Sequence, residues 1–175
     1  MRTIFVVTDH HHLIDLAKRK IYPAIFDIYK SGSLPKHWRV VGYARTHLSI
    51  DKLKDAIKPF LSDSKDAQFD EFFKRCHYLS GQYDQDEDYQ NLDKFLTEQE
   101  SSVQASKSNR IFYLSLPPNV FLDSAIRLGK FCKSHNGYNR IVIEKPFGRD
   151  LESFEELSSG INAIYSQDQV CISNS

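Results

Sequence analysis

A short apolar run that leads into a charged turn, residues 140–150, constrains the fold of this chain more than any other stretch. Residues 141–143 read Ile-Val-Ile, the unbroken β-branched run typical of a strand covered on both faces of a sheet. Glu144 and Lys145 then bring opposite charges to the carboxyl end of that strand, the edge where open α/β sheets bind ligands. Because Pro146 restricts the backbone of the residue before it, we expect Lys145 to be held in a fixed direction at this edge.

Strand-like and helix-like segments alternate along the chain, as a parallel sheet requires. Strands are expected at residues 3–7, 39–43, 109–115 and 140–143, and helices at residues 15–30, from 49 onward, 86–100, 118–133 and 151–165. Pro23 lies inside the first helical segment and predicts a kink or a restart there. Ser49 is expected to cap the next helix, whose apolar stripe would be Ile50, Leu53, Ile57 and Leu61.

The order of these segments predicts an α/β fold, a Rossmann-like, doubly wound and mostly parallel sheet with helices on both faces. Residues 62–108 are more polar, and we interpret them as an elaborated crossover between strands. One domain is expected over residues 1–170, followed by a divergent polar tail at residues 171–175.

Composition excludes several classes of protein. The 23 basic and 23 acidic residues balance, so the net charge gives no reason to expect nucleic acid or an anionic membrane as a partner. No apolar run approaches the ~20 residues of a membrane span, and because the segment from Met1 to Thr8 is too short for a secretory signal, we expect none. The three cysteines are widely spaced without a Cys-x-x-Cys pair, which favours reduced thiols and a cytoplasmic location.

Several short motifs occur in an order that resembles the glucose-6-phosphate dehydrogenase family. Residues 144–150 repeat the family signature Glu-Lys-Pro-Phe-Gly-Arg-Asp in full. The other matching segments are residues 16–18 with 20–23, 42–45 (Gly-Tyr-Ala-Arg), 80–84 (Ser-Gly-Gln-Tyr-Asp), and Leu114 with 116–118. The resemblance runs from about Ile4 to Gln169 and covers only the coenzyme domain of the family.

This resemblance implies an activity and a coenzyme. Members of the family oxidise glucose 6-phosphate to 6-phosphogluconolactone with reduction of NADP, in the pentose phosphate pathway. The family's histidine base and most of its sugar-phosphate pocket belong to a C-terminal substrate and dimerisation domain that this chain does not match. After Val170 the chain reads Cys-Ile-Ser-Asn-Ser, where the family has Arg-Ile-Asp-His-Tyr-Leu-Gly-Lys. We therefore expect no catalytic residue in this chain and leave open whether it acts as an enzyme.

Four residues are candidates for coenzyme contacts by resemblance. Arg45 matches the arginine that meets the adenosine 2′-phosphate of NADP, and guanidinium binds phosphate with paired donors. Tyr83 and Ser115 match positions on the nicotinamide side, and alanine is usual at the latter. Lys145 matches a lysine that contacts both coenzyme and sugar phosphate, and Glu144 is expected to orient it. The alternatives are a surface arginine at Arg45 and a buried ion bridge between Glu144 and Lys145.

The first strand-to-helix turn departs from the family pattern. The family has Gly-x-x-Gly-Asp there, whereas residues 8–15 of this chain read Thr-Asp-His-His-His-Leu-Ile-Asp. Glycines in this turn let the backbone approach the pyrophosphate, so their lack predicts weak or absent NADP binding. The tract His10, His11 and His12 would need a further ligand, such as Asp9 or Asp15, to hold a metal; a solvated loop is the favoured interpretation, and no metal is expected.

Two hypotheses of different classes therefore remain open from the sequence. The chain is either the coenzyme-binding part of a glucose-6-phosphate dehydrogenase, as a fragment or an incomplete gene product, or a shortened, non-catalytic relative. A shortened relative would act through a protein partner, such as a full-length homologue. In both cases we expect exposed apolar surface where a partner domain would pack.

Overall fold

A computed structural model describes residues 1–9, 16–61, 66–102, 106–144 and 151–173. Six parallel strands form one sheet in the order β3-β2-β1-β4-β5-β6. The strands are β1 (Arg2–Asp9), β2 (His37–Ala44), β3 (Cys76–Ser80), β4 (Ser108–Ser115), β5 (Asn139–Glu144) and β6 (Val170–Ser173). The expected doubly wound α/β fold is confirmed, and every strand pair described is parallel.

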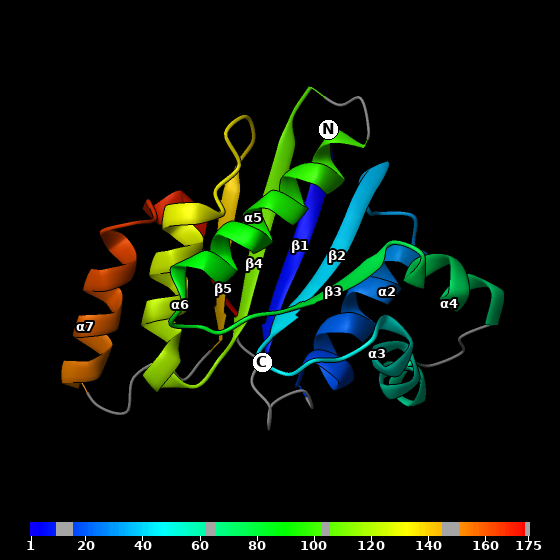
Figure 1. Cartoon of the computed structure of the whole chain (residues 1–175), viewed down its shortest axis with the longest axis horizontal. Coiled ribbons are helices and arrows are strands. Elements are labelled where there is room, and N and C mark those ends of the chain that lie inside the picture. The colour runs from blue at the N-terminus through cyan, green and yellow to red at the C-terminus, as the bar shows by residue number, and fades with distance from the viewer. Residues whose placement is uncertain (10–15, 62–65, 103–105, 145–150, 174–175) are drawn as a thin grey trace.

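Helices cover both faces of the sheet (Figure 1). One face carries α5 (Asp86–Ser101), α6 (Pro118–Phe131) and α7 (Leu151–Asn162). The other face carries the π-helix η1 (Ala17–Ile21), α2 (Tyr22–Lys30), α3 (Ile50–Ile57) and α4 (Asp66–Phe73). Short 3-10 turns, η2 (Lys58–Phe60) and η3 (Gln167–Gln169), complete the described elements.

The strands divide the apolar side chains between two cores because successive residues point to opposite faces of a sheet. In β1, Ile4 and Val6 belong to the core under α5, α6 and α7, whereas Val7 belongs to the core under α2, α3 and α4. Aromatic rings fill the second core, where Phe26 and Phe72 meet edge to face with centroids 5.2 Å apart. Both faces of the central strands are therefore buried, as the continuous apolar runs predict.

The irregularity predicted at Pro23 is present, but it takes the form of a π-helix just before the proline. The amide of Tyr22 donates to the carbonyl of Ala17, five residues back. Proline has no N–H to donate and its ring clashes with the carbonyl four residues earlier, so a wider turn at this point lets the helix continue.

The predicted cap of α3 is also present, because the side chain of Ser49 accepts from the amide of Lys52 at 3.3 Å. The helix ends at Ile57, before Pro59, so Leu61 does not lie on its stripe as expected, although Leu61 is buried in the same core.

Two segments differ from the sequence interpretation. The crossover at residues 62–108 contains a strand of the sheet, β3. Its sequence, Cys-His-Tyr-Leu-Ser, mixes polar and apolar residues, which fits an edge strand but gives no clear strand pattern. Residues Cys171, Ile172 and Ser173, expected in a polar tail, belong to β6 and pair with β5. None of the described helices has the length and apolar content that a membrane crossing needs.

Candidate functional site

The carboxyl ends of the six strands meet at one edge of the sheet, because all of them run in the same direction. The strand order reverses between β1 and β4, whose ends pair through Asp9 and Ser115. Connections leave the two strands toward opposite faces, and this opens the crevice in which doubly wound folds bind ligands. The first turn of the chain, with its three histidines, lies outside the described residues.

Arg45 follows β2 directly and is exposed at this edge. Its guanidinium carbon lies 5.5 Å from the centre of the Tyr83 ring, within the range of a cation–π contact. The structure thus brings together two of the residues named from the sequence, although they are 38 positions apart. A cavity of about 110 Å³ beside them is lined by Arg45, Gln82, Tyr83, Asp84, Val120 and Asp123.

Tyr83 is a rigid platform for the arginine. Its side chain is buried, and its carbonyl accepts a hydrogen bond from the Tyr89 hydroxyl at 3.3 Å. Burial raises the pKa of Tyr89 and of the neighbouring Tyr43, so both rings stay neutral. Gly81 is required beneath them, because a Cβ there would lie 2.4 Å from the Tyr43 hydroxyl oxygen.

Two buried hydroxyls at the same edge have no hydrogen-bond partner among the described residues. They belong to Ser115, the last residue of β4, and to Thr46, the residue after Arg45. Buried polar groups are nearly always satisfied, so an unpartnered hydroxyl at a ligand-binding edge is a group that a ligand can pair with. These groups, with the exposed Arg45 beside an aromatic ring, fit a phosphate-bearing dinucleotide. Thr46 was missed from the sequence, where no pattern marks it.

Glu144 ends β5 and accepts a hydrogen bond of 2.5 Å from the Tyr113 hydroxyl of β4. Burial and the Glu144 carboxylate raise the pKa of Tyr113 to about 12. Lys145, the residue expected to contact both coenzyme and sugar phosphate, lies outside the described residues, and so do residues 146–150. Among the described residues, the phenol of Tyr113 is a partner of Glu144.

A cavity of about 370 Å³ opens beside this pair on the face that carries α2. Lys20, Tyr113, Glu144 and Ser173 supply its polar groups, and Ile28, Ile111 and Val142 belong to its apolar wall. Lys20 was not named as a site residue from the sequence, although it lies in the matched segment Lys20-Ile21-Tyr22-Pro23. Lys20 is the cation in the lining of this cavity, and a lysine can bind phosphate as a point charge.

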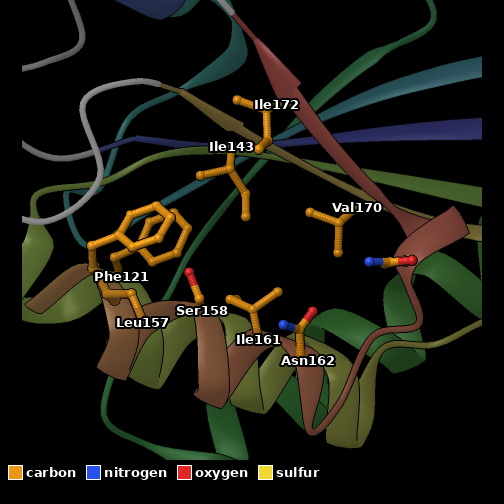
Figure 2. A pocket seen from close by; sticks show the side chains of 10 residues that line it. Phe121, Ile143, Leu157, Ser158, Ile161, Asn162, Val170 and Ile172 are labelled. Carbon is orange, nitrogen blue, oxygen red and sulfur yellow. The ribbon is translucent and has the colours of Figure 1, made fainter. Parts of the chain in front are cut away.

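A second large cavity, about 240 Å³, lies on the opposite face between α7 and strands β5 and β6. Figure 2 shows Ile143 and Ile172 of the strands facing Leu157 and Ile161 of the helix. Its lining is apolar apart from the uncharged side chains of Ser158, Asn162 and Gln167. It offers no cation, so it does not fit a phosphate. No group of three or more His, Cys, Asp or Glu side chains that could hold a metal occurs in the described part of the chain.

Comparison with known proteins identifies the family of this chain. The family described as "Glucose-6-phosphate dehydrogenase, NAD binding domain" matches residues 13–172. Two relatives from Arabidopsis thaliana are glucose-6-phosphate 1-dehydrogenase 6, cytoplasmic, 42% identical over 167 residues, and glucose-6-phosphate 1-dehydrogenase 1, chloroplastic, 41% identical over 162 residues. Each match covers 89% of this chain, but only 32% and 28% of the respective relatives.

A solved structure shares the whole fold. It is described as glucose-6-phosphate dehydrogenase in complex with its substrate glucose-6-phosphate, and it superposes with a TM-score of 0.90 at 34% sequence identity. The match covers 98% of this chain and 36% of that one. This chain thus spans about a third of the length of the proteins it matches, and the matched part is a dinucleotide-binding domain. The chain belongs to the glucose-6-phosphate dehydrogenase family.

Proposed function

We propose that this chain is an NADP-binding module of the glucose-6-phosphate dehydrogenase type. The observation that carries the proposal is the position of Arg45, exposed at the end of β2 with its guanidinium over the Tyr83 ring. NADP differs from NAD by a 2′-phosphate on the adenosine ribose, and doubly wound folds accommodate that phosphate with an arginine near the end of the second strand. The retained arginine therefore favours NADP over NAD.

Other contacts in the proposed site come from the ends of β4 and β5. The unpartnered hydroxyl of Ser115 is available to the coenzyme at the crevice between β1 and β4. Lys145 follows the hydrogen-bonded Glu144 and, from the matched signature, is proposed to contact both the coenzyme and the sugar phosphate. Lys20, in the same cavity as Glu144, is a second candidate cation for the sugar phosphate.

The proposed reaction to which this module contributes is oxidation of glucose 6-phosphate. Bound NADP supplies the hydride acceptor. The described residues bind and orient: Arg45 neutralises phosphate charge, Tyr83 supplies a rigid surface, and the ends of β4 and β5 face the substrate side. A base must also take the proton of the sugar hydroxyl, and none of the 175 residues matches the family's histidine. We therefore propose that this polypeptide alone does not turn over substrate.

A titration with NADP and NAD tests the coenzyme proposal. NADP should bind more tightly than NAD, with a dissociation constant above the micromolar range because the first turn lacks glycine. Arg45→Ala should weaken NADP binding by about 10-fold or more, the loss expected for a charge-assisted hydrogen bond. Lys36→Ala is the matched control, because Lys36 is an exposed cation just before β2, at the opposite end of the strand. Equal affinity for the two coenzymes would overturn the proposal.

An activity assay separates binding from catalysis. Purified protein with glucose 6-phosphate and NADP should give no NADPH absorbance at 340 nm beyond the rate without enzyme. Turnover by this polypeptide would show that a base exists within it and would refute the non-catalytic part of the proposal.

A role in protein association is the second candidate, and exposed apolar residues favour it. Ile28 is 43% exposed on the wall of the 370 Å³ cavity, where a partner would cover it. A full-length homologue is the proposed partner. Sedimentation should show association that Ile28→Lys reduces and that the distant Lys36→Ala does not; a clean monomer with or without the homologue would exclude this role.

The cytoplasm is the proposed location, since the balanced charge and the free cysteines suit a reducing compartment. Cell fractionation checks it, and recovery of the protein in chloroplasts or another organelle would contradict it.

A further inference from the structure

Two hydrogen bonds hold the segment that follows β2, one before and one after Arg45 in the sequence. The amide of Gly81 donates to the carbonyl of Ala44 at 3.0 Å, and the hydroxyl of Tyr78 donates to the carbonyl of Thr46 at 2.8 Å. Both donors belong to β3 or to the residue after it. The backbone on each side of Arg45 is therefore held by the neighbouring strand rather than left to fluctuate as a loop.

His47 is a second basic side chain on this fixed segment. It is exposed, and the hydroxyl of Ser80 lies 3.1 Å from its Nδ1 and 3.3 Å from its Nε2. Ser80 is the sheet partner of Ala44, the residue before Arg45. Arg45 thus contacts Tyr83 and His47 contacts Ser80, and both partners lie at or just after the end of β3. Thr46 stands between them in the sequence, and its hydroxyl has no partner among the described residues.

We propose that His47 is a specificity-determining residue, the second cationic contact for the phosphomonoester held by Arg45. This inference rests on the proposed NADP site and names a further residue of it. Two cationic side chains two residues apart on one fixed segment repel each other, and a phosphate that contacts both lowers that repulsion. Binding of the 2′-phosphate and protonation of His47 should therefore favour each other, because coupled binding is reciprocal.

Other charged groups occur on the same segment and on the adjoining elements, and they also act on the charge of His47. Arg45 shares the segment, Asp51 and Lys52 stand in the first turn of α3, and Asp84 and Asp88 follow β3. The Asp88 carboxylate accepts from the amide of Gln82 at 2.7 Å, so this acidic group is already engaged with the backbone. These charges are the same with either coenzyme, so the 2′-phosphate is the anion that distinguishes NADP from NAD.

Affinity measurements with His47→Gln test the inference, since glutamine keeps a polar side chain but cannot be protonated. At about pH 6, NADP should bind the wild type about 2- to 5-fold more tightly than the variant, the size expected for an exposed charge pair. At about pH 8.5 the difference should shrink, because an imidazole carries less positive charge as the pH rises. Comparing wild type with variant at each pH cancels the titration of the phosphate itself. NAD should bind both proteins equally at either pH.

The outcomes separate this inference from the coenzyme proposal. If Arg45→Ala weakens NADP binding while His47→Gln matches the wild type at both pH values, the role of His47 is wrong and the coenzyme site stands. If neither variant changes NADP binding, both are wrong.

Inorganic phosphate is the third probe. If it shows the same dependence on His47 and pH at the same affinity as NADP, the segment recognises free phosphate and the assigned ligand is wrong. An independent readout is the NMR signal of the His47 imidazole at about pH 6, which should shift with saturating NADP and keep its position with NAD; equal shifts with both coenzymes would overturn the inference.

Discussion

Tyr113 joins two of the strand ends that form the ligand edge. Its hydroxyl donates to Glu144, its carbonyl accepts from the Thr8 hydroxyl at 3.1 Å, and it therefore connects β1, β4 and β5. The contact through the hydroxyl involves Glu144, the residue that precedes Lys145. At the scale of single residues, the direction of Glu144 is set by a phenol on the next strand.

The titration of Tyr113 reports this contact. Glu144→Gln should lower the pKa of the Tyr113 phenol from about 12, because the amide no longer repels the phenolate. Ser173→Ala should change it in the opposite direction, since the Ser173 hydroxyl stabilises the phenolate. NMR of tyrosine labelled at the Cζ carbon measures both variants, and an unchanged value in Glu144→Gln would mean that the two side chains do not meet in solution.

The raised pKa of Tyr113 also affects the stability of the fold at high pH. The pKa of Tyr113 is raised in the folded state above the usual value of 10, so the folded protein binds more protons than the unfolded chain between about pH 10 and pH 12. Its contribution to stability is complete below pH 10 and is lost as the pH rises toward 12. Burial shifts Tyr43, Tyr89 and Tyr165 in the same direction. The urea midpoint should therefore fall above pH 10, and a constant midpoint would contradict the raised values.

At the scale of elements, a buried arginine joins the crossover helix α5 to β4. Arg110 is 1% exposed and pairs with both carboxylate oxygens of Glu100, through its Nε at 2.8 Å and its Nη2 at 2.9 Å. It also donates to Asp93, Thr97 and the carbonyl of Cys132. This network fixes the helix that returns the chain from the edge strand β3 to the centre of the sheet.

Breaking the hydrogen-bond network of Arg110 should lower the stability of the fold. Glu100→Gln leaves the buried guanidinium with less negative charge and should lower the free energy of unfolding by about 3 kcal/mol. Lys130→Ala is the control, because it removes the exposed pair with Asp86 and a surface contact with the Phe131 ring, and it should cost less than about 1 kcal/mol. Urea denaturation compares the two; equal effects would show that the buried pair contributes no more than a surface one.

The turn between α6 and β5 depends on a close approach of two backbones. A Cβ at Gly137 would lie 1.8 Å from the carbonyl oxygen of Ser108. Gly137→Ala should therefore shift one of the chains and destabilise the fold by about 1 to 3 kcal/mol. His135→Ala, an exposed change in the same turn, should stay within about 0.5 kcal/mol of the wild type. Thermal denaturation measures both, and a stable Gly137→Ala variant would mean that the turn is looser than described.

For the molecule as a whole, a ligand that binds only the folded state must stabilise it. NADP at one hundred times its dissociation constant should add about 2.7 kcal/mol, which corresponds to a rise in Tm of about 5 to 10 °C. NAD at the same concentration should give a smaller rise, because it lacks the 2′-phosphate. Scanning calorimetry measures both, and identical shifts would argue against a site built on Arg45.

The sequence by itself determined the elements that depend on local residue patterns. β-branched runs marked β1, β2, β4 and β5, Ser49 marked a helix cap, and the unbroken Glu-Lys-Pro-Phe-Gly-Arg-Asp signature marked the family. These features depend on neighbours a few residues apart, so a pattern can report them. A turn without glycine was equally visible in the sequence.

Only the tertiary structure decided which distant residues meet. β3 is a strand because β2 pairs with it, although its own five residues carry no clear strand pattern. Tyr83 reaches Arg45, Tyr113 reaches Glu144 and Ser80 reaches His47 because the strand order places their elements side by side. Contacts across a sheet are set by strand order and register, and these depend on the packing of the whole chain rather than on any one segment.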